Sequence, residues 1–304
     1  MSTSEISAPA LQRNVPLTAH TTLKIGGPAH LFAEPANEEQ LIKLLGWSRQ
    51  ERLPFFILGN GSNVLFDDAG YQGLVISMRS FENDLIKVDL ESCRVTVSAG
   101  ASLSRLVRFC QESGLAGTEF LAHIPGTVGG ALVMNAGFSR HAGQQNAIGD
   151  LVEEVRALTR EGAVVQRSRE ELNFSYRHSN LGDLIVLEVT LRLWRRPKEQ
   201  ITQEMKANLD FRKKLQNIQE PNAGSVFKNP PAPHPSAGFL IEKAGLKGKR
   251  IGGIQISEQH ANYFVNKGGA TSADVIRLIE EVQKTLLHAT GIILEPEIRI
   301  IPKN

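Results

Sequence analysis

A glycine-rich stretch, LGNGSNVL at residues 58–65, comes directly after an apolar run that predicts a buried strand, Phe55–Leu58. Glycine allows backbone N–H groups to turn inward, and Ser62 and Asn63 add short polar side chains. Such a loop can wrap a pyrophosphate, because concave turns of backbone N–H groups attract anions. Taken alone, the stretch is equally compatible with an ordinary structural turn.

A second stretch of small residues, IPGTVGGA at 124–131, runs into MNAG at 134–137. Small residues throughout imply that a ligand or another part of the backbone approaches closely. Taken singly, this stretch too is compatible with a structural turn, but two separated loops suit a long dinucleotide better than one phosphate group. Neither stretch ends in the Lys-Ser/Thr of a P-loop, which disfavours ATP or GTP hydrolysis. Neither fits GxGxxG between a strand and a helix, which disfavours a Rossmann site.

The first segment of the chain, residues 1–79, alternates helix and strand signals. Three leucines recur at helical spacing and predict a helix over residues 38–53. The apolar run Leu74–Ser77 predicts a further strand.

The second segment, residues 80–197, indicates α+β structure. Alternating apolar residues predict a strand over Arg94–Ser98, and a helical stripe follows from Leu103 to Cys110. Strands dominate from Leu151 onward, and Leu184–Trp194 is the longest strand candidate. We expect a sheet formed from consecutive neighbours.

The third segment, residues 198–304, opens with a polar helix that ends in the basic cluster Arg212–Lys214. A later helix is expected between Thr271, which can cap it, and Gly291, which ends it. The residues Ile292–Ile301 then predict a strand that Pro296 interrupts.

Composition excludes several classes of function. The chain has 304 residues, 41% hydrophobic and 22% charged, which is ordinary for a folded soluble protein. The net charge is +2 and the basic residues are scattered, which disfavours nucleic-acid binding. No run approaches 18 apolar residues and Met1–Pro9 is polar, so we expect neither membrane insertion nor a secretory signal.

The cysteines and histidines point to a cytoplasmic protein without a metal site. Cys93 and Cys110 stand alone and are expected to be reduced thiols. The eight histidines show no metal-ligand spacing.

Several further blocks join the two glycine-rich loops in one resemblance. In chain order they read TTLKIGG at 21–27, GNGSNVL at 59–65, PGTVGG at 125–130, NAG at 135–137, SYRHS at 175–179, NAGSVFKNP at 222–230 and LEPE at 294–297. The set resembles the UDP-N-acetylenolpyruvoylglucosamine reductase family over roughly residues 18 to 300. The order and number of blocks make coincidence a poor explanation.

The resemblance implies an α+β fold with a two-part FAD-binding region of the PCMH/vanillyl-alcohol-oxidase type and a C-terminal substrate domain. The boundaries drawn from composition agree with it: 1–79 and 80–197 for the two FAD-binding subdomains, and 198–304 for the substrate domain. FAD is expected to be held non-covalently and reduced by NADPH. The expected FAD-binding residues are Gly59, Asn60, Gly61, Ser62, Asn63, Val64, Gly126, Thr127, Gly129, Gly130, Asn135, Ala136 and Gly137.

The activity that the resemblance implies is reduction of UDP-N-acetylglucosamine enolpyruvate to UDP-N-acetylmuramate for bacterial peptidoglycan. Arg177 is expected to stabilise the enolate that forms when hydride reaches the vinyl carbon, because its fork matches a carboxylate. Glu297 is expected to complete this stabilisation, through a proton shared with the carboxylate or through a bound water; as a proton donor it needs a raised pKa. Ser225 is the expected proton donor to the adjacent carbon.

Six residues form a second tier of expected contacts to the UDP-sugar: Tyr176, Arg212, Lys214, Lys228, Asn229 and His260. For His260 a partly exposed loop histidine, and for Arg212 and Lys214 a solvated helix face, are the competing interpretations. We expect no obligate protein partner.

The chain departs from the family pattern at three places. His123 stands where glycine is common beside the flavin loop, and Asn217 where proline is common. The segment between Tyr176 and Leu184 is short, so the chain resembles the shorter form of the family, which lacks a loop with a clamping tyrosine.

Two competing functions stay open from the residues. One is another FAD-dependent oxidase or dehydrogenase of the same wider fold, against which the NAGS and LEPE blocks argue. The other is a non-catalytic flavin- or nucleotide-binding protein, against which the joint presence of Arg177, Ser225 and Glu297 argues.

Overall fold

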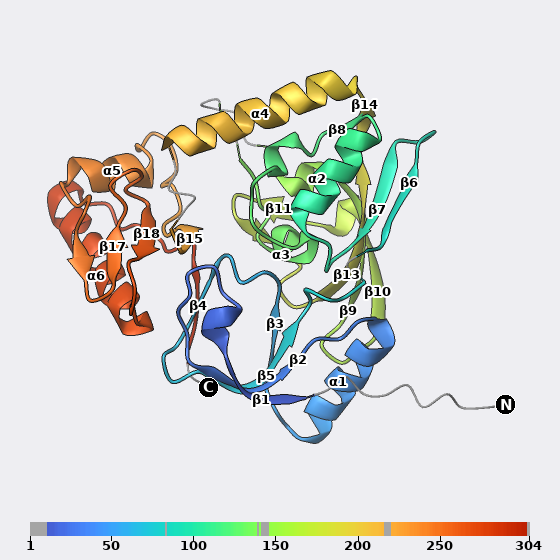
Figure 1. Cartoon of the computed structure of the whole chain (residues 1–304), viewed down its shortest axis with the longest axis horizontal. Coiled ribbons are helices and arrows are strands. Elements are labelled where there is room, and N and C mark those ends of the chain that lie inside the picture. Colours follow the sequence, from blue (N-terminus) through green and yellow to red (C-terminus); the bar gives the residue numbers. More distant parts are fainter. Residues whose placement is uncertain (1–10, 83, 139, 141–145, 216–219, 303–304) are drawn as a thin grey trace. The chain divides into compact units, whose positions relative to one another are not determined.

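The structure, a computed structural model, describes residues 11–82, 84–138, 140, 146–215 and 220–302 (Figure 1). Contacts divide the chain into two compact units. Unit 1 comprises Met1–Arg13, Leu31–Asn60 and Gly73–Leu209, and unit 2 comprises Asn14–His30, Gly61–Gln72 and Asp210–Asn304. The three-segment division at 79/80 and 197/198 stays a prediction, and Asn217 lies outside the described residues.

The first sheet has the strand order β1-β2-β5-β3. Its strands are β1 (Gln12–Pro16), β2 (Pro28–Ala33), β3 (Phe55–Leu58) and β5 (Tyr71–Ser77). Strands β3 and β5 run parallel, and the predicted strands 55–58 and 74–77 are confirmed.

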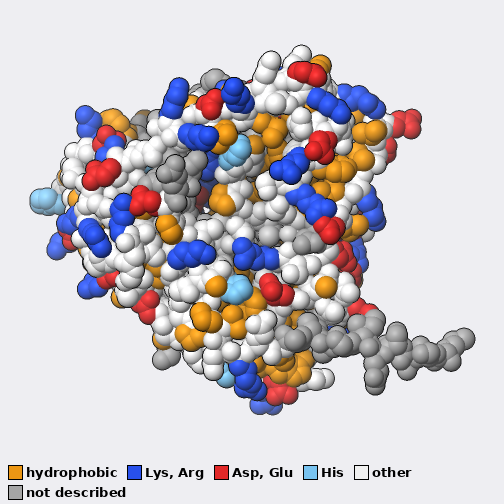
Figure 2. Space-filling model, in the orientation of Figure 1, with side chains coloured by type: hydrophobic (Ala, Val, Ile, Leu, Met, Phe, Trp, Pro, Cys, Tyr) orange, Lys and Arg blue, Asp and Glu red, His pale blue; other side chains and the backbone are white. Residues whose placement is uncertain are grey.

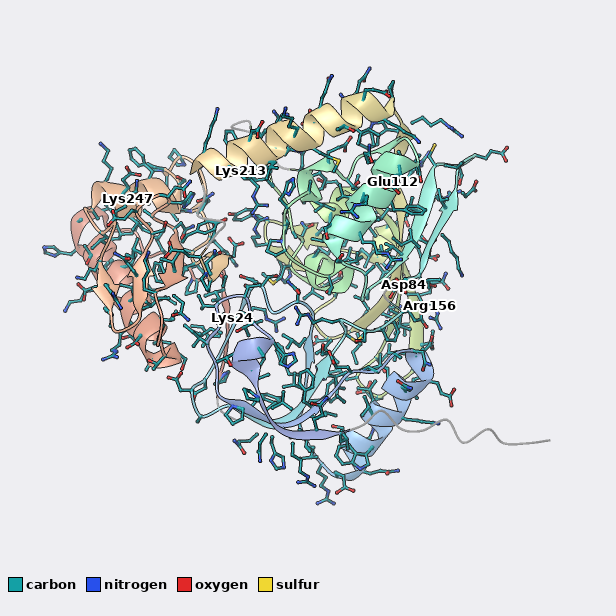
Figure 3. The ribbon with its side chains drawn as sticks, in the orientation of Figure 1. Lys24, Asp84, Glu112, Arg156, Lys213 and Lys247 are labelled. Carbon is teal, nitrogen blue, oxygen red and sulfur yellow. The ribbon has the colours of Figure 1, made fainter. Side chains whose placement is uncertain are left out.

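Helix α1 (Glu38–Gln50) confirms the helix predicted from the spacing of leucines. The side chain of Asn37 caps it by accepting the N–H of Gln40 at 3.1 Å. Arg156, labelled in Figure 3, donates two hydrogen bonds to Glu38, at 2.8 and 2.7 Å. The helix therefore has a capped N-terminus that is also tied to a strand of unit 1.

The second sheet of unit 1 is antiparallel, with the order β10-β9-β13-β7-β6. Its strands are β6 (Ile86–Asp89), β7 (Arg94–Ser98), β9 (Val152–Leu158), β10 (Val164–Ser168) and β13 (Ile185–Arg192). Helices α2 (Leu103–Glu112) and α3 (Val128–Val133) share its core. The helix and the strands are confirmed. The expectation of consecutive neighbours holds for β6 with β7 and for β9 with β10, but it is wrong for β13, which lies between β9 and β7. This strand alternates buried apolar residues along most of its length, which suits a central position.

Short elements complete unit 1. Strand β8 (Leu115–Ala116) pairs with β14 (Trp194–Arg195), and β11 (Phe174–Ser175) pairs with β12 (His178–Ser179). The longer helix α4 (Lys198–Leu215) belongs to unit 1 only as far as Leu209. It confirms the polar helix predicted after Pro197, and its Ile201 is buried. Single turns of 3-10 helix occur at Leu17–Ala19, Glu119–Leu121, Ile148–Leu151 and Arg169–Glu171.

Unit 2 contains the sheet β15-β18-β17-β16 and two helices. The strands are β15 (Asn222–Ser225), β16 (Arg250–Ile251), β17 (Ile254–Ile256) and β18 (Tyr263–Asn266), and the helices are α5 (Ala237–Lys243) and α6 (Ser272–Thr290). Strand β4 (Val64–Phe66) pairs in parallel with β19 (Arg299–Ile301). The predicted strand over 292–301 is therefore right only for its last three residues, since proline at 296 has no N–H to continue a ladder.

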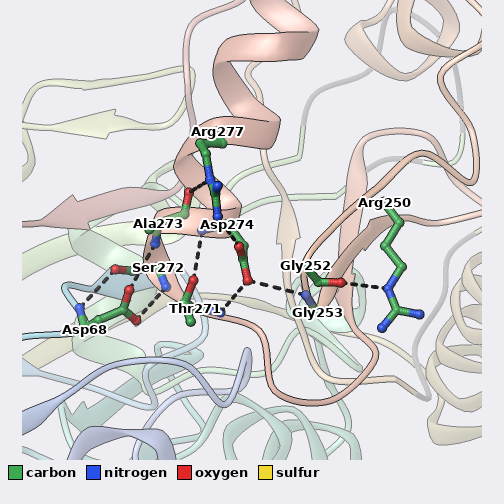
Figure 4. Close-up of polar contacts among 9 residues, drawn as sticks. All are labelled: Asp68, Arg250, Gly252, Gly253, Thr271, Ser272, Ala273, Asp274 and Arg277. Carbon is green, nitrogen blue, oxygen red and sulfur yellow. Dashed lines mark hydrogen bonds and ion pairs between the residues drawn. The ribbon is translucent and has the colours of Figure 1, made fainter.

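The N-terminus of α6 is capped as the sequence predicts (Figure 4). The Thr271 hydroxyl accepts the N–H of Asp274 at 3.1 Å, and the Asp274 carboxylate accepts the N–H of Thr271 at 3.1 Å. Asp68, from outside the helix, accepts the N–H groups of Ser272 at 2.7 Å and Ala273 at 3.1 Å. These carboxylates therefore satisfy three N–H groups at or next to the helix N-terminus.

Charged side chains are mixed over the visible face, where blue basic and red acidic groups alternate in Figure 2. Among the described residues, every helix is too short or too polar to cross a membrane. Within the same part of the chain, no group of three or more His, Cys, Asp or Glu side chains is placed to hold a metal ion.

Candidate functional site

The two glycine-rich loops meet in unit 1. A Cβ atom added to Gly59 would lie 2.6 Å from Thr127 Oγ1 and 3.8 Å from Gly130 Cα. Thr127 caps α3 by accepting the N–H of Gly130 at 3.3 Å, so its hydroxyl is held in place. Position 59 therefore requires glycine, and within unit 1 Gly59 and the second loop form one surface.

Free backbone donors lie on this surface. Within the described part of the chain, the N–H groups of Gly59, Asn60, Gly126 and Thr127 donate no hydrogen bond. Gly59, Asn60 and Gly126 are half-buried, so their N–H groups are accessible to a bound anion. The N–H groups at the start of α3 differ, because Val128 donates to Ala101 O at 2.9 Å and Gly129 to Ala99 O at 2.9 Å.

Gly129 has a packing role. A Cβ atom there would lie 2.9 Å from Ala99 Cβ, so α3 approaches the neighbouring strand end only because the residue is glycine. Together with its paired N–H group, this explains the residue without a cofactor contact.

The remainder of the first loop, Gly61–Asn63, lies in unit 2. Gly61 has φ +66°, and a Cβ atom there would lie 2.0 Å from His20 O. Thr22 holds the loop by donating its N–H to Gly61 O at 3.0 Å and its hydroxyl to Asn222 O at 2.7 Å. In this part of the described chain too, the N–H groups of Gly61, Ser62 and Asn63 donate no hydrogen bond, and Val64 is buried in β4.

Arg79 is a residue that sequence reasoning missed. Its guanidinium donates to Asn60 Oδ1 at 2.9 Å, which brings a positive charge to the first loop. The signal in the sequence was a basic residue shortly after β5, the strand that pairs with β3, and it requires the strand pairing to be known.

The block Asn135-Ala136-Gly137 supports the hairpin that carries Arg177. The Asn135 amide donates to Ser175 O at 2.8 Å and accepts the N–H of Gly149 at 3.0 Å. Gly137 O accepts a hydrogen bond from the Arg177 guanidinium at 3.1 Å. The buried Asn135 side chain is thus used within the protein, and the FAD contacts expected of this block stay a prediction.

Arg177 occupies a strained position in unit 1. It lies with Tyr176 in the two-residue turn between β11 and β12, and its φ is +55°. A left-handed conformation costs a non-glycine residue roughly 1–2 kcal/mol. The guanidinium lies 5.1 Å from the centroid of the Tyr176 ring, which favours a defined direction for the charge. Backbone strain of this kind is typical of functional positions.

Ser225 and Glu297 are brought together in unit 2. Ser225 ends β15 just after Gly224, whose φ is +75°, and among the described residues its hydroxyl makes no hydrogen bond. Glu297 donates its N–H to Val226 O at 2.7 Å, which places its segment against the residue that follows the serine. Asn63 of the first loop donates to Glu297 O at 3.1 Å.

The second-tier residues differ in how the protein uses them. Lys228 Nζ lies 2.6 Å from Glu295 Oε1, and the Asn229 side chain accepts the N–H of Ala237 at 3.0 Å. Arg212 is buried on α4, whereas Lys214 is exposed. Lys213, which lies between them, is labelled in Figure 3.

His260 is held as a neutral imidazole. Burial lowers its pKa, and its Nδ1 accepts the N–H of Asn262 at 3.2 Å, so the proton is assigned to Nε2. Its ring meets that of Tyr263 edge-on at 4.9 Å. His260 therefore offers an N–H donor rather than a charge.

His123 adopts φ +70°, in the region that favours glycine. This explains in physical terms why the resemblance places glycine at this position.

Comparison with known proteins gives one consistent result. A family model described as "UDP-N-acetylenolpyruvoylglucosamine reductase, C-terminal domain" matches residues 216–301, and one described as "FAD binding domain" matches residues 29–168. These matches, with the mixed helices and strands, confirm the predicted fold class of an FAD-binding region followed by a C-terminal domain.

Individual relatives cover almost the whole chain. The UDP-N-acetylenolpyruvoylglucosamine reductase of Heliobacterium modesticaldum is 45% identical over 94% of this chain and 89% of its own length. That of Bacillus subtilis is 40% identical over 96% of this chain and 94% of its own. The crystal structure of UDP-N-acetylenolpyruvylglucosamine reductase (MurB) from Thermus caldophilus has 37% identity, a TM-score of 0.80, and coverage of 97% of this chain and 100% of that one. The chain therefore belongs to the UDP-N-acetylenolpyruvoylglucosamine reductase family.

Proposed function

We propose that this chain catalyses the NADPH-driven, FAD-dependent reduction of UDP-N-acetylglucosamine enolpyruvate to UDP-N-acetylmuramate, a step of bacterial peptidoglycan synthesis. One observation carries the proposal beyond family membership. The Ser225 hydroxyl is only partly buried, makes no hydrogen bond among the described residues, and lies on a strand whose next residue is bonded to Glu297. This backbone bond places the main chain of Glu297 beside the strand that carries the serine, as a shared role for the two residues requires.

FAD fits the loops that the structure shows. The unpaired N–H groups of Gly59 and Asn60, and those of Gly126 and Thr127, all in unit 1, would hold its pyrophosphate, with the Arg79 charge nearby. When bound, FAD supplies the hydride that NADPH provides and that the vinyl carbon of the substrate receives. In this proposal, residues 1–79 and 80–197 form the two FAD-binding subdomains, and residues 198–304 bind the UDP-sugar.

Arg177 would bind the carboxylate of the enolpyruvyl group. Its guanidinium matches a carboxylate with two parallel N–H donors. Hydride addition to the vinyl carbon leaves a negative charge on the adjacent carbon and its carboxylate, which this cation would stabilise. Glu297 would add to this stabilisation through a proton shared with the carboxylate or through a bound water. Ser225 would then deliver a proton to that carbon, which completes addition of H⁻ and H⁺ across the double bond.

The second-tier residues would orient the rest of the substrate. Lys228 carries three N–H donors, and its contact with Glu295 uses one of them, so two remain for a diphosphate oxygen or the sugar. His260 would donate from Nε2 to a neutral acceptor. Arg212, Lys214, Tyr176 and Asn229 complete the proposed substrate contacts.

The proposed location is the cytoplasm, with no obligate protein partner. The free thiols of Cys93 and Cys110 suit a reducing compartment. Burial raises the pKa of Cys110 to about 12, so that thiol is protonated at neutral pH.

The test is an anaerobic two-step titration of the purified flavoprotein. NADPH bleaches the oxidised flavin band, and UDP-N-acetylglucosamine enolpyruvate is then added in the absence of oxygen. Return of the band with formation of UDP-N-acetylmuramate supports the proposal, and the variants Ser225→Ala and Arg177→Ala should each slow that return at least 100-fold. Arg108→Ala, an exposed arginine on α2, is the matched control. A flavin that stays reduced in the presence of the enol ether would refute the substrate assignment.

A further inference from the structure

The three residues that follow the proposed proton donor, Val226–Lys228, are held from two sides in unit 2. On one side, Val226 O accepts the N–H of Glu297 at 2.7 Å, and Lys228 donates its N–H to Glu295 O at 2.9 Å. On the other side lies Asn262, whose main-chain oxygen accepts the N–H of Val226 at 2.9 Å. The segment thus resembles a central strand with a partner on each edge.

On the Asn262 side, part of this partner is a side chain. The Asn262 amide oxygen accepts the N–H of Phe227 at 3.0 Å, and its amide nitrogen donates to Phe227 O at 2.8 Å. Regular backbone pairing between β15 and β18 ends at Ser225 and Tyr263. Beyond that point the Asn262 side-chain amide makes two hydrogen bonds to the backbone in place of the next strand residue. Asn262 is 3% exposed and Phe227 is fully buried, so bulk solvent does not compete for these bonds in the intact protein.

Asn262 also reaches a proposed substrate contact. Its main-chain N–H donates to His260 Nδ1 at 3.2 Å and so fixes which ring nitrogen carries the proton. Asn262 therefore holds the segment that joins Ser225 to Glu297, and it also holds the imidazole of His260.

We infer that Asn262 is a positioning residue for the proton-delivery step, which acts by fixing the backbone of Val226–Phe227 and through it the relation of Ser225 to Glu297. The inference rests on the proposed function. Asn262 itself touches no reacting atom. Its removal leaves two buried backbone groups of Phe227 without partners, and the segment must shift to satisfy them. A displacement on the order of 1 Å at a reacting group costs about 100-fold in rate.

The two half-reactions separate this role from a general loss of stability. Reduction of the flavin by NADPH needs no proton from Ser225, whereas reoxidation by the enolpyruvyl substrate does. We expect Asn262→Ala, measured per bound flavin by anaerobic stopped flow, to slow reoxidation about 100-fold and to leave reduction by NADPH nearly unchanged. Asn262→Asp keeps the size and one acceptor but sets a carboxylate oxygen against Phe227 O, so it should show the same split. If the alanine variant does not accumulate as a flavoprotein, the aspartate variant decides.

The matched control is Asp274→Asn, which removes a buried, multiply bonded carboxylate of unit 2 that has no bond to the Ser225 segment. It should lower stability and leave both half-reactions unchanged per bound flavin. Equal slowing of both half-reactions by Asn262→Ala or Asn262→Asp, or reoxidation at the control's rate, would overturn the inference while the proposed function stands. If the wild-type flavin is reduced by NADPH but not reoxidised by the enol ether, the proposed function falls, and this inference falls with it.

Discussion

The N-terminus of α6 allows a prediction whose size follows from the structure. The Asp274 carboxylate is 6% exposed and accepts N–H groups of Thr271 at 3.1 Å and Gly253 at 3.4 Å (Figure 4). Its other oxygen accepts from Arg277 at 2.6 Å. Burial alone would raise the pKa of Asp274, but these bonds, with the Thr271 hydroxyl, outweigh it and lower that pKa.

The substitution Asp274→Asn keeps the shape and removes the charge. The bond to Thr271 changes from a charged to a neutral acceptor, which costs about 1 kcal/mol, and the longer bond to Gly253 loses less. Loss of a negative charge at a helix N-terminus costs about 0.3–1 kcal/mol, and the exposed pair with Arg277 a few tenths. We expect unit 2 to lose about 2–3 kcal/mol of stability at neutral pH.

The difference in the free energy of unfolding between wild type and Asp274→Asn should depend on pH, and it should decrease only towards acid pH. An aspartate in an unfolded chain has a pKa of about 3.9, and that of Asp274 is lower in the folded state. The stabilisation by the carboxylate is therefore fully present above about pH 4 and is lost as the pH falls through the folded-state pKa. The difference in the free energy of unfolding between the two proteins should be constant around neutral pH and should decrease below about pH 4.

Hydrogen exchange of the α6 amides is the suitable assay. Both tryptophans, Trp47 and Trp194, belong to unit 1, so tryptophan fluorescence does not report on this helix. A loss of 2–3 kcal/mol predicts about 30- to 150-fold faster exchange, at about 1.4 kcal/mol per tenfold. The control Glu280→Gln removes an exposed charge from the same helix and should have little effect. Equal exchange rates in Asp274→Asn and the control, or a gap that persists unchanged at acid pH, would refute the reasoning.

Three further predictions concern unit 1. Gly59→Ala places a methyl group against the hydroxyl that caps α3 and should weaken FAD binding at least tenfold in a flavin titration. The control Gly46→Ala, in an open helical position, should stabilise the fold by about 0.5–1 kcal/mol. Equal FAD affinity in the two variants would contradict the loop geometry. His123→Gly relieves a left-handed conformation and should raise the free energy of urea unfolding by about 0.5–1 kcal/mol; a loss of stability would show that contacts of the imidazole outweigh the strain. With an aromatic disulfide reagent at pH 8, one thiol of the folded protein should react, because Cys93 is partly exposed and burial raises the pKa of Cys110 to about 12; rapid reaction of two thiols would contradict that burial.

The elements that the sequence predicts well are those with a local cause. The leucines of α1 and the capping residues of α6 act within a few positions of one another, so spacing alone reveals them. The central position of β13 is different, because it depends on pairing with β9, roughly 30 positions earlier, and with β7, roughly 90 positions earlier. The alternation of residues within β13 does not specify those partners. The residues around Pro296 show a different kind of error. The apolar residues predict a strand that continues on both sides of the proline, whereas the proline itself forms a single isolated bridge.

The candidate site likewise has features that the sequence predicts and features that it does not. Glycines of the two loops are visible in the sequence because a missing side chain matters wherever a backbone or ligand approaches, but the sequence does not say which of the two approaches. At Gly129 the structure shows a backbone approach, since the neighbour is Ala99 and the N–H is already paired. At Gly59 the Thr127 hydroxyl approaches and the N–H is unpaired in the described chain, so a ligand contact there stays a prediction.

Side chains that bond to distant backbone are the hardest to foresee. Thr22 donates to Asn222 O across 200 positions, and Asn262 pairs with Phe227 across 35. In the sequence both are ordinary polar residues, because nothing in their neighbourhood records that a strand ends where their side chains arrive. Such residues act where regular pairing stops, and in this fold pairing stops beside Ser225. A proton donor needs a backbone that is fixed yet leaves its hydroxyl unbonded, and a side-chain amide that replaces one ladder position meets both requirements.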